Sequence, residues 1–241
     1  MNLVINKDVY VKDLGSIDFK EAWDFQTSIF EKSLGVKTAN RDLPDQLQQP
    51  TDNYLVFCQH PHVYTLGKSG KENNLLVSQD ELASLKATFY QINRGGDITY
   101  HGPGQLVCYL IIDLENFFTD IHKYMRFLEE AVIQTLAEFN LRAGRIDGLT
   151  GVWIDPEKRP RKICALGVKT SRWITMHGLA LNVHPNLSYF DHIVPCGIND
   201  KAVTSLQAEV GGVVEIKEVQ RILQDKITSL FEMNLRLSHD S

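Results

Sequence analysis

Apolar residues along the chain recur with two periods, which together predict a mixture of helices and strands. A spacing of three or four positions predicts amphipathic helices over residues 18–34, 120–140 and 215–234. Short apolar or alternating runs predict strands over residues 9–14, 54–58, 63–66, 89–93, 106–112, 151–154, 161–169 and 174–183. Several strands follow one another without a helix between them. This order favours an α/β fold with a mixed sheet, of the α+β kind, over a regular parallel sheet.

The segments between these elements give three further expectations. Residues 35–53 are polar and contain Pro44 and Pro50, which predicts a surface loop or lid. Ser78 followed by Glu81 predicts a capping box at the start of a short helix. No internal repeat, low-complexity tract or change in composition divides the 241 residues, so we expect one catalytic domain over residues 1–241.

Composition and charge exclude several classes of protein. The net charge of −5 argues against broad binding to nucleic acid, which requires a basic surface. Residues 1–13 contain no apolar signal core, and the longest apolar run, near residues 106–112, is too short to span a bilayer. The four cysteines form no CxxC pair, and Cys58, Cys108 and Cys164 lie in strand-like runs. We therefore expect a cytoplasmic protein with reduced, buried thiols, Cys196 being the exception.

The segment with the strongest chemical signal is the glycine-rich run RGGDITYHGPGQ, residues 94–105. Glycine permits positive φ and close approach of a ligand to the main chain, whereas a plain hairpin needs only a few residues. A tight turn between two strands is the simpler alternative. The segment precedes a strand and not a helix, so it does not predict a dinucleotide site. LGKS at residues 66–69 is similar to the end of a P-loop, but His62 occupies the position of the first glycine.

Cys196 and Lys162 are the candidate catalytic pair. Cys196 lies between a proline and a glycine in a predicted loop, where a thiol is accessible and neighbouring N–H groups can face an oxyanion. An idle loop thiol is the alternative. Lys162 shares a strand face with Cys164 and Leu166, which is unusual for an unpaired lysine. It is either an edge-strand lysine that prevents aggregation or a cation that stabilises a thiolate.

Two other features have weaker implications. Gly178 interrupts a strand, which often marks the close approach of a ligand or of another backbone. His60, His62 and His101 carry no carboxylate or cysteine at ligand spacing, so we expect no metal site.

Four motifs in order give the chain a resemblance to the lipoyl(octanoyl) transferase family. They are RGGxxTxHGPGQ at residues 94–105, KIxxxG at 162–167, HGxALN at 177–182 and PCG at 195–197. The resemblance covers about residues 54–205. One position departs from the pattern, because Cys164 stands where the family more often has alanine.

The resemblance implies the fold of biotin protein ligases, lipoate ligases and class II aminoacyl-tRNA synthetases. It also implies a catalytic dyad of Cys196 and Lys162. The acyl group would contact Arg94, Gly95, Gly96, Asp97, Ile98, Thr99, Tyr100, His101, Ala165, Leu166, Gly167, Gly178, Leu179 and Ala180. We expect the glycines among them to keep the acyl slot free of side chains.

The family's activity implies a medium-chain acyl transfer, with octanoyl as the expected group. Acyl carrier protein would be the donor. The acceptors would be lipoyl domains of 2-oxoacid dehydrogenase E2 subunits and the glycine cleavage H protein. No cofactor or ATP is expected, and neither nucleic acid nor membrane is a predicted partner. We expect a monomer. Since the chain is net negative, docking requires a local basic patch, for which the candidates are Arg159, Arg161, Lys169 and Arg172.

Three alternatives remain open from the sequence. An ATP-dependent lipoate or biotin ligase on the same fold would not need Cys196. A cysteine thioesterase or peptidase would use Cys196 with His101 or His177 and release a free acid. A carrier-binding module without catalysis would form no covalent adduct.

Overall fold

The computed structural model describes residues 5–194 and 202–237 of the chain. The strands are β1 (Asp8–Ser16), β2 (Asn53–Gln59), β3 (Val63–Leu66), β4 (Thr88–Gln91), β5 (Ile98–His101), β6 (Gln105–Ile111), β7 (Ala143–Ile146), β8 (Leu149–Ile154), β9 (Arg161–Ser171), β10 (Ile174–Asn182), β11 (Ala202–Val203) and β12 (Asn234–Leu237). The α-helices are α1 (Phe19–Asn40), α2 (Gln79–Ser84), α3 (Ile121–Ala137), α4 (Leu206–Val210) and α5 (Ile216–Phe231). Short 3₁₀ helices cover Asp45–Leu47, Glu72–Asn74, Leu114–Asn116 and Leu187–His192.

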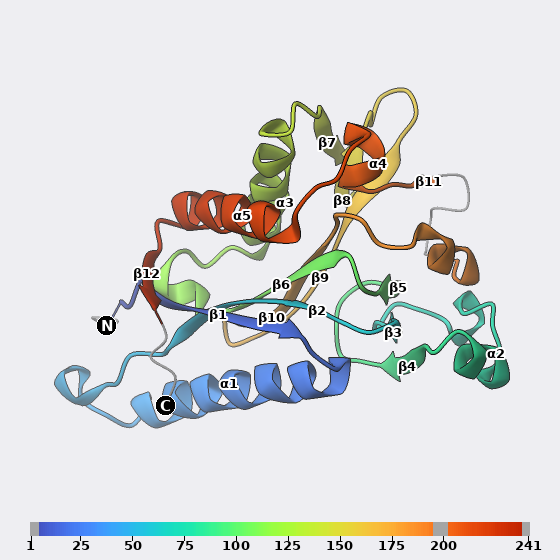
Figure 1. Cartoon of the computed structure of the whole chain (residues 1–241). Coiled ribbons are helices and arrows are strands. Elements are labelled where there is room, and N and C mark those ends of the chain that lie inside the picture. Colours follow the sequence, from blue (N-terminus) through green and yellow to red (C-terminus); the bar gives the residue numbers. More distant parts are fainter. Residues whose placement is uncertain (1–4, 195–201, 238–241) are drawn as a thin grey trace.

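The strands form two sheets, and both contain parallel and antiparallel pairs. The large sheet runs in the order β12-β1-β2-β6-β10-β9-β8-β7, with β11 paired to β9. Within it β1 is parallel to β2 and to β12, whereas β6, β8, β9 and β10 pair antiparallel. The small sheet, β4-β3-β5, lies at one end of the large one (Figure 1). The predicted mixed-sheet α/β fold is therefore confirmed.

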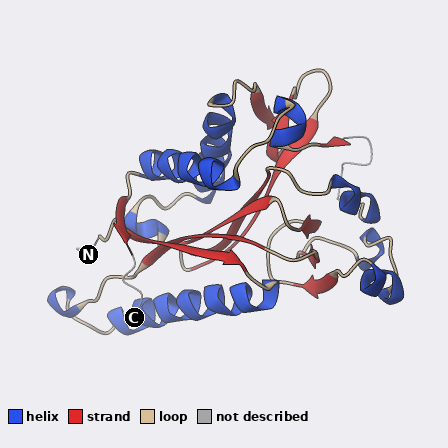
Figure 2. Cartoon of the chain, in the orientation of Figure 1, coloured by secondary structure: helices blue, strands red, loops and turns tan. Residues whose placement is uncertain are grey.

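Helices cover both faces of the large sheet. Helix α1 lies along one face, while α3 and α5 lie together on the other (Figure 2). Ala22, Ile29 and Phe30 of α1 pack in one cluster with residues of β2, β6 and β10. The second cluster joins α3 and α5 to the opposite face. Because β6 lies between two strands and under both layers, all its residues are buried, as its continuous apolar run predicts.

Two predicted helix boundaries are wrong. Helix α1 continues through Gly35 to Asn40, so part of the predicted loop at residues 35–53 is helical. Lys37 bonds Asp113 at 2.9 Å and lies 2.8 Å from a carboxylate oxygen of Glu115, which fixes the last turn despite the cost of an internal glycine. At the other end of the chain, α5 stops at Phe231, and residues 234–237 form a strand against β1.

The glycine-rich segment is also more regular than the predicted loop. Residues 98–101 form β5, which pairs antiparallel with β3. Ile98, Thr99 and Tyr100 are residues that favour extended structure, and β3 offers them a partner that the sequence pattern did not specify.

Other local predictions are confirmed. Residues 151–154 and 161–169 form an antiparallel hairpin, β8 and β9. Ser78 and Glu81 make the expected capping box at the start of α2. Within residues 5–194 and 202–237, no helix has the length and apolar character needed to cross a membrane.

Candidate active site

The centre of the site is the pairing of β9 with β10. Their register places Ala165 opposite Ala180, Leu166 opposite Leu179, and Gly167 opposite Gly178. The two short segments predicted to line an acyl slot are thus cross-strand neighbours, although they lie in different sequence motifs.

Two glycines in this pair are required by the protein itself. A Cβ at Gly167 would lie 2.6 Å from Cδ and Nη1 of Arg94. A Cβ at Gly178 would lie 2.2 Å from the carbonyl oxygen of Cys108 on β6. For Gly167 the expectation that a glycine clears space for the acyl group is corrected, whereas Gly178 shows the close approach of another backbone that was one of its two predicted alternatives. Gly167 leaves room for an arginine side chain, and Gly178 lets two backbones approach closely.

Arg94 fixes the glycine-rich segment from within. Its guanidinium donates to the carbonyl oxygens of Gly95 and Asp97 at 2.8 Å and of Thr65 at 3.2 Å. Burial lowers the pKa of Arg94 to about 10, and the side chain is only 8% exposed. Its Nε has no hydrogen-bond partner among the described residues. Arg94 therefore holds the loop in shape while its guanidinium forms part of the cavity wall.

The LGKS segment packs against this loop and does not form a phosphate cradle. The amide N–H groups of Gly67, Lys68 and Ser69 donate to carbonyl oxygens of residues 97, 94 and 96, at 3.2, 2.9 and 3.1 Å. A P-loop needs such amides to face phosphate, and here they are already bonded. The interpretation of this segment as unrelated to a P-loop is supported by these contacts.

Two adjoining cavities lie over the β9–β10 pair. The outer cavity has a volume of about 970 Å³ and the inner cavity about 40 Å³. Both are lined by Arg94, Thr99, Ala165, Leu166 and Ala180. The outer cavity also contacts Gly96, Asp97, Ile98 and Lys162, and the inner cavity contacts His101, Gly167, Gly178 and Leu179. The five shared residues make the two cavities neighbours in one site.

Two predicted contact residues lie outside both cavities. Gly95 bonds through its N–H to the carbonyl of Val168. Tyr100 is fully buried in a separate aromatic cluster that includes Tyr64 and Tyr189. A role for Gly95 or Tyr100 in substrate binding stays a prediction.

Lys162 enters the outer cavity from β9. Its ammonium lies 4.7 Å from the centre of the Trp153 ring, a cation–π contact. Gly151 has φ of 127°, and a Cβ there would lie 3.2 Å from Cε of Lys162. Burial lowers the pKa of Lys162 to about 8. The amine is thus balanced between its charged and neutral forms near neutral pH.

Cys196, the predicted nucleophile, lies outside the described residues. The described residues on either side of that segment, Val194 and Ala202, both line the outer cavity with Lys162. Val203 pairs with Lys162 through β11. Cys58, Cys108 and Cys164 are buried free thiols, as predicted, and burial raises the pKa of each.

A chain of side-chain amides orients His101 at the boundary of the inner cavity. The Asn182 amide nitrogen donates to the carbonyl of Thr204 at 3.0 Å, so its oxygen accepts from Gln105 at 2.9 Å. Gln105 nitrogen also donates to the Tyr100 carbonyl, which leaves its oxygen 2.7 Å from Nδ1 of His101. Nδ1 must carry the proton, because that oxygen only accepts. Burial lowers the pKa of His101 to about 3, so the ring is neutral with Nε2 as an acceptor.

Comparison with known proteins identifies the family. Residues 18–228 match the model of the lipoyl protein ligase A/B catalytic domain. The chain belongs to this family. It is 60% identical to an octanoyltransferase from Cytophaga hutchinsonii, over 95% of each chain, and 56% identical to one from Christiangramia forsetii, over 96% of this chain and 99% of the relative. A bipartite lipoate protein ligase from Thermoplasma acidophilum has the same fold, with a TM-score of 0.71 and 18% identity over 98% of this chain and 88% of that one.

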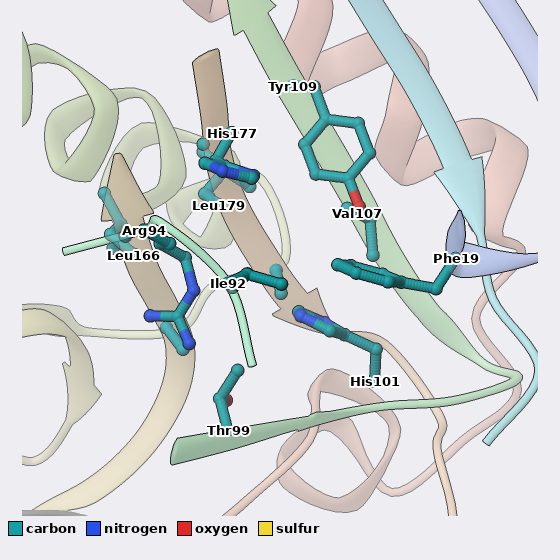
Figure 3. Close-up of a pocket in the computed structure, with 14 residues that line it drawn as sticks. Phe19, Ile92, Arg94, Thr99, His101, Val107, Tyr109, Leu166, His177 and Leu179 are labelled. Atoms are coloured by element: carbon teal, nitrogen blue, oxygen red, sulfur yellow. The ribbon is translucent and has the colours of Figure 1, made fainter. Parts of the chain in front are cut away.

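Five residues that line the inner cavity were not among the predicted contact residues, although one of them, His177, belongs to the HGxALN motif. Phe19, Ile92, Val107, Tyr109 and His177 all contact this cavity, and Figure 3 shows them around one space. Most of them resemble ordinary core residues in sequence. His177 is the exception, because in the sequence this polar ring directly precedes Gly178, the glycine that interrupts the strand. From the sequence it is assigned only as the general base of the alternative cysteine hydrolase.

The histidines are arranged for packing and hydrogen bonding. His60 bonds the Tyr109 hydroxyl at 2.7 Å, and its ring centre lies 6.0 Å from that of His101. His62 faces elsewhere and stacks on Tyr189 at 4.0 Å. Across the described parts of the chain, no group of three or more His, Cys, Asp or Glu residues is placed to hold a metal ion.

The predicted basic patch is not one surface. Arg161 and Lys169 lie about 26 Å apart along the extended β9, because each strand residue advances about 3.3 Å. Arg161 also forms a two-point ion pair with Glu209, at 2.8 and 2.9 Å. Arg172 lies at the far end of β9 and bonds Thr38. The grouping of Arg159 and Arg161 with these two residues is therefore wrong, since nearness in sequence to a strand does not bring its two ends together.

Proposed function

We propose that the protein transfers an octanoyl group from octanoyl-acyl carrier protein to the ε-amine of a lysine in a lipoyl domain, through a thioester on Cys196. The family and the octanoyltransferases at 60% and 56% identity support the reaction class. The observation that carries the proposal is Lys162, a buried amine with a lowered pKa in a cavity that adjoins an apolar slot.

The choice of nucleophile follows by elimination among the cysteines. Cys58, Cys108 and Cys164 are buried in the core, and burial disfavours their thiolates. Cys196 is the remaining cysteine of the chain. The described neighbours of its segment, Val194 and Ala202, contact the same cavity as Lys162, which supports a Cys196–Lys162 pair.

The first step exchanges one thioester for another. The Cys196 thiolate attacks the acyl carbonyl carbon, a new C–S bond forms, and the bond to the phosphopantetheine sulfur breaks. The departing thiolate takes a proton from the Lys162 ammonium and leaves with the carrier protein, and Lys162 is then neutral. The Lys162 ammonium favours the attacking thiolate because the two charges are opposite.

The second step forms the amide. The acceptor amine attacks the Cys196 thioester, the C–S bond breaks, and the thiolate is restored. The amine must lose a proton, and Lys162 accepts it, whereas His101 borders the inner cavity and its pKa of about 3 makes it a weak base. Lys162 suits this role because a pKa of about 8 lies near the working pH. The thioester supplies the driving force, so the reaction consumes no ATP and needs no other cofactor. We expect the enzyme to act as a cytoplasmic monomer.

The decisive experiment combines the purified protein with octanoyl-acyl carrier protein, without ATP or acceptor. We expect an octanoyl adduct by intact mass, labile to hydroxylamine and mapped to the Cys196 peptide. Adding a lipoyl domain should discharge it. Cys196→Ser should abolish the adduct and lower turnover at least 10³-fold, about 4 kcal/mol. Cys164→Ala should keep both, since Cys164 is a core residue.

Two outcomes would contradict the proposal. Modification of the lipoyl domain only when ATP and free octanoate are supplied, with Cys196→Ser still active, would identify a ligase. Release of free octanoate without any product on the lipoyl domain would identify a thioesterase.

A further inference from the structure

The inner cavity differs in lining from the outer one. Its walls beyond the shared residues are mainly rings and aliphatic groups: Phe19, Ile92, Val107, Tyr109 and Leu179. The outer cavity instead adds charged and amide side chains, among them Asp97, Lys162 and Asn182. An alkyl tail gains free energy by leaving water for apolar surroundings, so it favours the inner end.

The two cavities are also aligned along β9. Lys162 lies at the outer end and Gly167 at the inner end, about 17 Å apart on an extended strand. An acyl chain whose carbonyl lies near Lys162 therefore points its tail past Ala165 and Leu166. Ala165 and Leu166 lie about 10–13 Å from Lys162 along β9, so the inner cavity is the place where the tail of an acyl chain long enough to pass them ends.

Helix α1 closes that inner end. Phe19, its first residue, is 2% exposed, and its ring stacks on His101 with centres 6.1 Å apart. It also meets the edge of the His60 ring at 5.4 Å. Figure 3 shows the Phe19 ring beside Tyr109 and His101, facing the space opposite Arg94. Phe19 is thus a fixed wall, held by rings on more than one side.

The neighbouring walls are tied to the same helix. His60 Nδ1 donates to the carbonyl of Ile17, just before α1, at 2.8 Å, so its Nε2 accepts from the Tyr109 hydroxyl. His177 has φ of 65°, a rare conformation for a non-glycine residue, and its N–H donates to Gln26 of α1 at 2.9 Å. Strand β10 is therefore held in an unfavourable backbone conformation at His177, whose imidazole borders the inner cavity. The start of α1 therefore determines the depth of the inner cavity.

We propose that the inner cavity receives the distal carbons of a medium-chain acyl group and that Phe19 sets the longest chain the site accepts. The inference rests on the proposed acyl transfer and adds its length specificity. Acyl groups that reach Phe19 bury all their methylenes, and longer ones must displace a ring that α1 holds in place.

The test measures transfer from acyl carrier protein loaded with 6-, 8-, 10- or 12-carbon groups to a lipoyl domain. We compare the ratio of kcat/KM for the 10-carbon and 8-carbon donors, which cancels losses of active protein. Phe19→Leu shortens the wall, and each newly buried methylene is worth about fourfold. The ratio should rise about tenfold. Phe19→Trp should lower it and favour the 6-carbon donor.

Phe30→Leu is the matched control. Phe30 lies on the same helix, is 4% exposed and contacts Lys169, and it is not among the residues that line either cavity. The ratio of kcat/KM for the 10-carbon and 8-carbon donors in Phe30→Leu should equal that of the wild type. An unchanged ratio in both Phe19 variants would overturn the proposal, as would an equal rise in Phe30→Leu, which would indicate general loosening of α1.

A second measurement separates this inference from the proposed function. If the wild type transfers no acyl group of any length, the acyl-transfer proposal fails. The shift in Tm caused by free fatty acids of the same four lengths then decides the role of the cavity. The length inference is supported if the fatty acid that raises Tm most is longer in Phe19→Leu than in the wild type. It is refuted if all four lengths shift Tm equally in both proteins.

Discussion

The outer and inner cavities share five lining residues but differ in the rest of their lining. The outer one contains an amine whose pKa is lowered to about 8, and it is lined by Val194 and Ala202, the described residues on either side of the Cys196 segment. The inner one is closed by Phe19 and by walls tied to α1. Under the proposed function, reactivity depends on the Lys162 end of β9 and chain-length selection depends on the Gly167 end. Changes at one end should therefore leave the other function intact.

Lys162→Met should have the largest effect and should act on all acyl lengths equally. We expect transfer to fall at least 10³-fold, about 4 kcal/mol, with an unchanged ratio between 10- and 8-carbon donors. Lys169→Met is the control, because Lys169 also lies on β9 over an aromatic ring, that of Phe30, at 4.6 Å. It should retain activity within about twofold. A length-dependent loss in Lys162→Met would remove the distinction between the cavities.

Lys162→Met should also stabilise the fold. The folded pKa of Lys162, about 8, lies below its unfolded value of about 10.4, so the ammonium costs free energy in the folded state below about pH 8. This cost declines between pH 8 and 10.4 and is absent above. Lys162→Met should raise the free energy of unfolding by about 2 kcal/mol at pH 7 and by little at pH 10.5. Urea unfolding at the two pH values measures it.

Gly167→Ala tests the boundary between the cavities. The added methyl would overlap Arg94, which must move and release the glycine-rich loop. We expect a loss of about 1–3 kcal/mol in stability and a drop in transfer for every acyl length. Gly35→Ala is the control, since a Cβ at residue 35 would have no other atom within 4 Å and α1 gains a better helix former. Equal behaviour of the two variants would show that Arg94 does not need Gly167.

Trp153→Leu should have the smallest effect on rate constants. Loss of the cation–π contact destabilises the ammonium by about 0.5–1 kcal/mol, so the pKa of Lys162 falls by about half a unit. The pH profile of kcat should shift toward acid by that amount. Trp153→Phe keeps a ring face and should shift less. If both profiles coincide with the wild type, Trp153 only packs against Lys162.

The sequence predicted the parts of the site whose signal is local. Ala165–Gly167 and Gly178–Ala180 were found because their motifs are short and continuous, and the structure pairs them. The end wall was missed because Phe19 and Val107 have the periodicity of core residues. The reason for Gly167 also lay beyond the pattern, since its constraint is the side chain of Arg94, which only the tertiary fold brings near.

The fold likewise has features that a local sequence pattern predicts and features that depend on contacts distant in sequence. The central strand β6 and helix α3 followed from their own apolar periodicity. The end of α1 did not, because Lys37 is held by Asp113 and Glu115 from another part of the chain. Strand β5 likewise depends on β3 as a partner. Features that depend on contacts distant in sequence are those that a pattern of residues leaves undetermined.

The parallel pairing of β1 with β12 has a consequence for how the chain folds during synthesis. Asp8 lies opposite Asn234, so this pair joins strands separated by almost the whole described length of the chain. A nascent polypeptide cannot form it until residues 234–237 have been synthesised, and such long-range pairing is slow. Until then β1 exposes a free edge that other chains can join. We therefore expect folding intermediates that lack the β1–β12 pair to be prone to association through this edge.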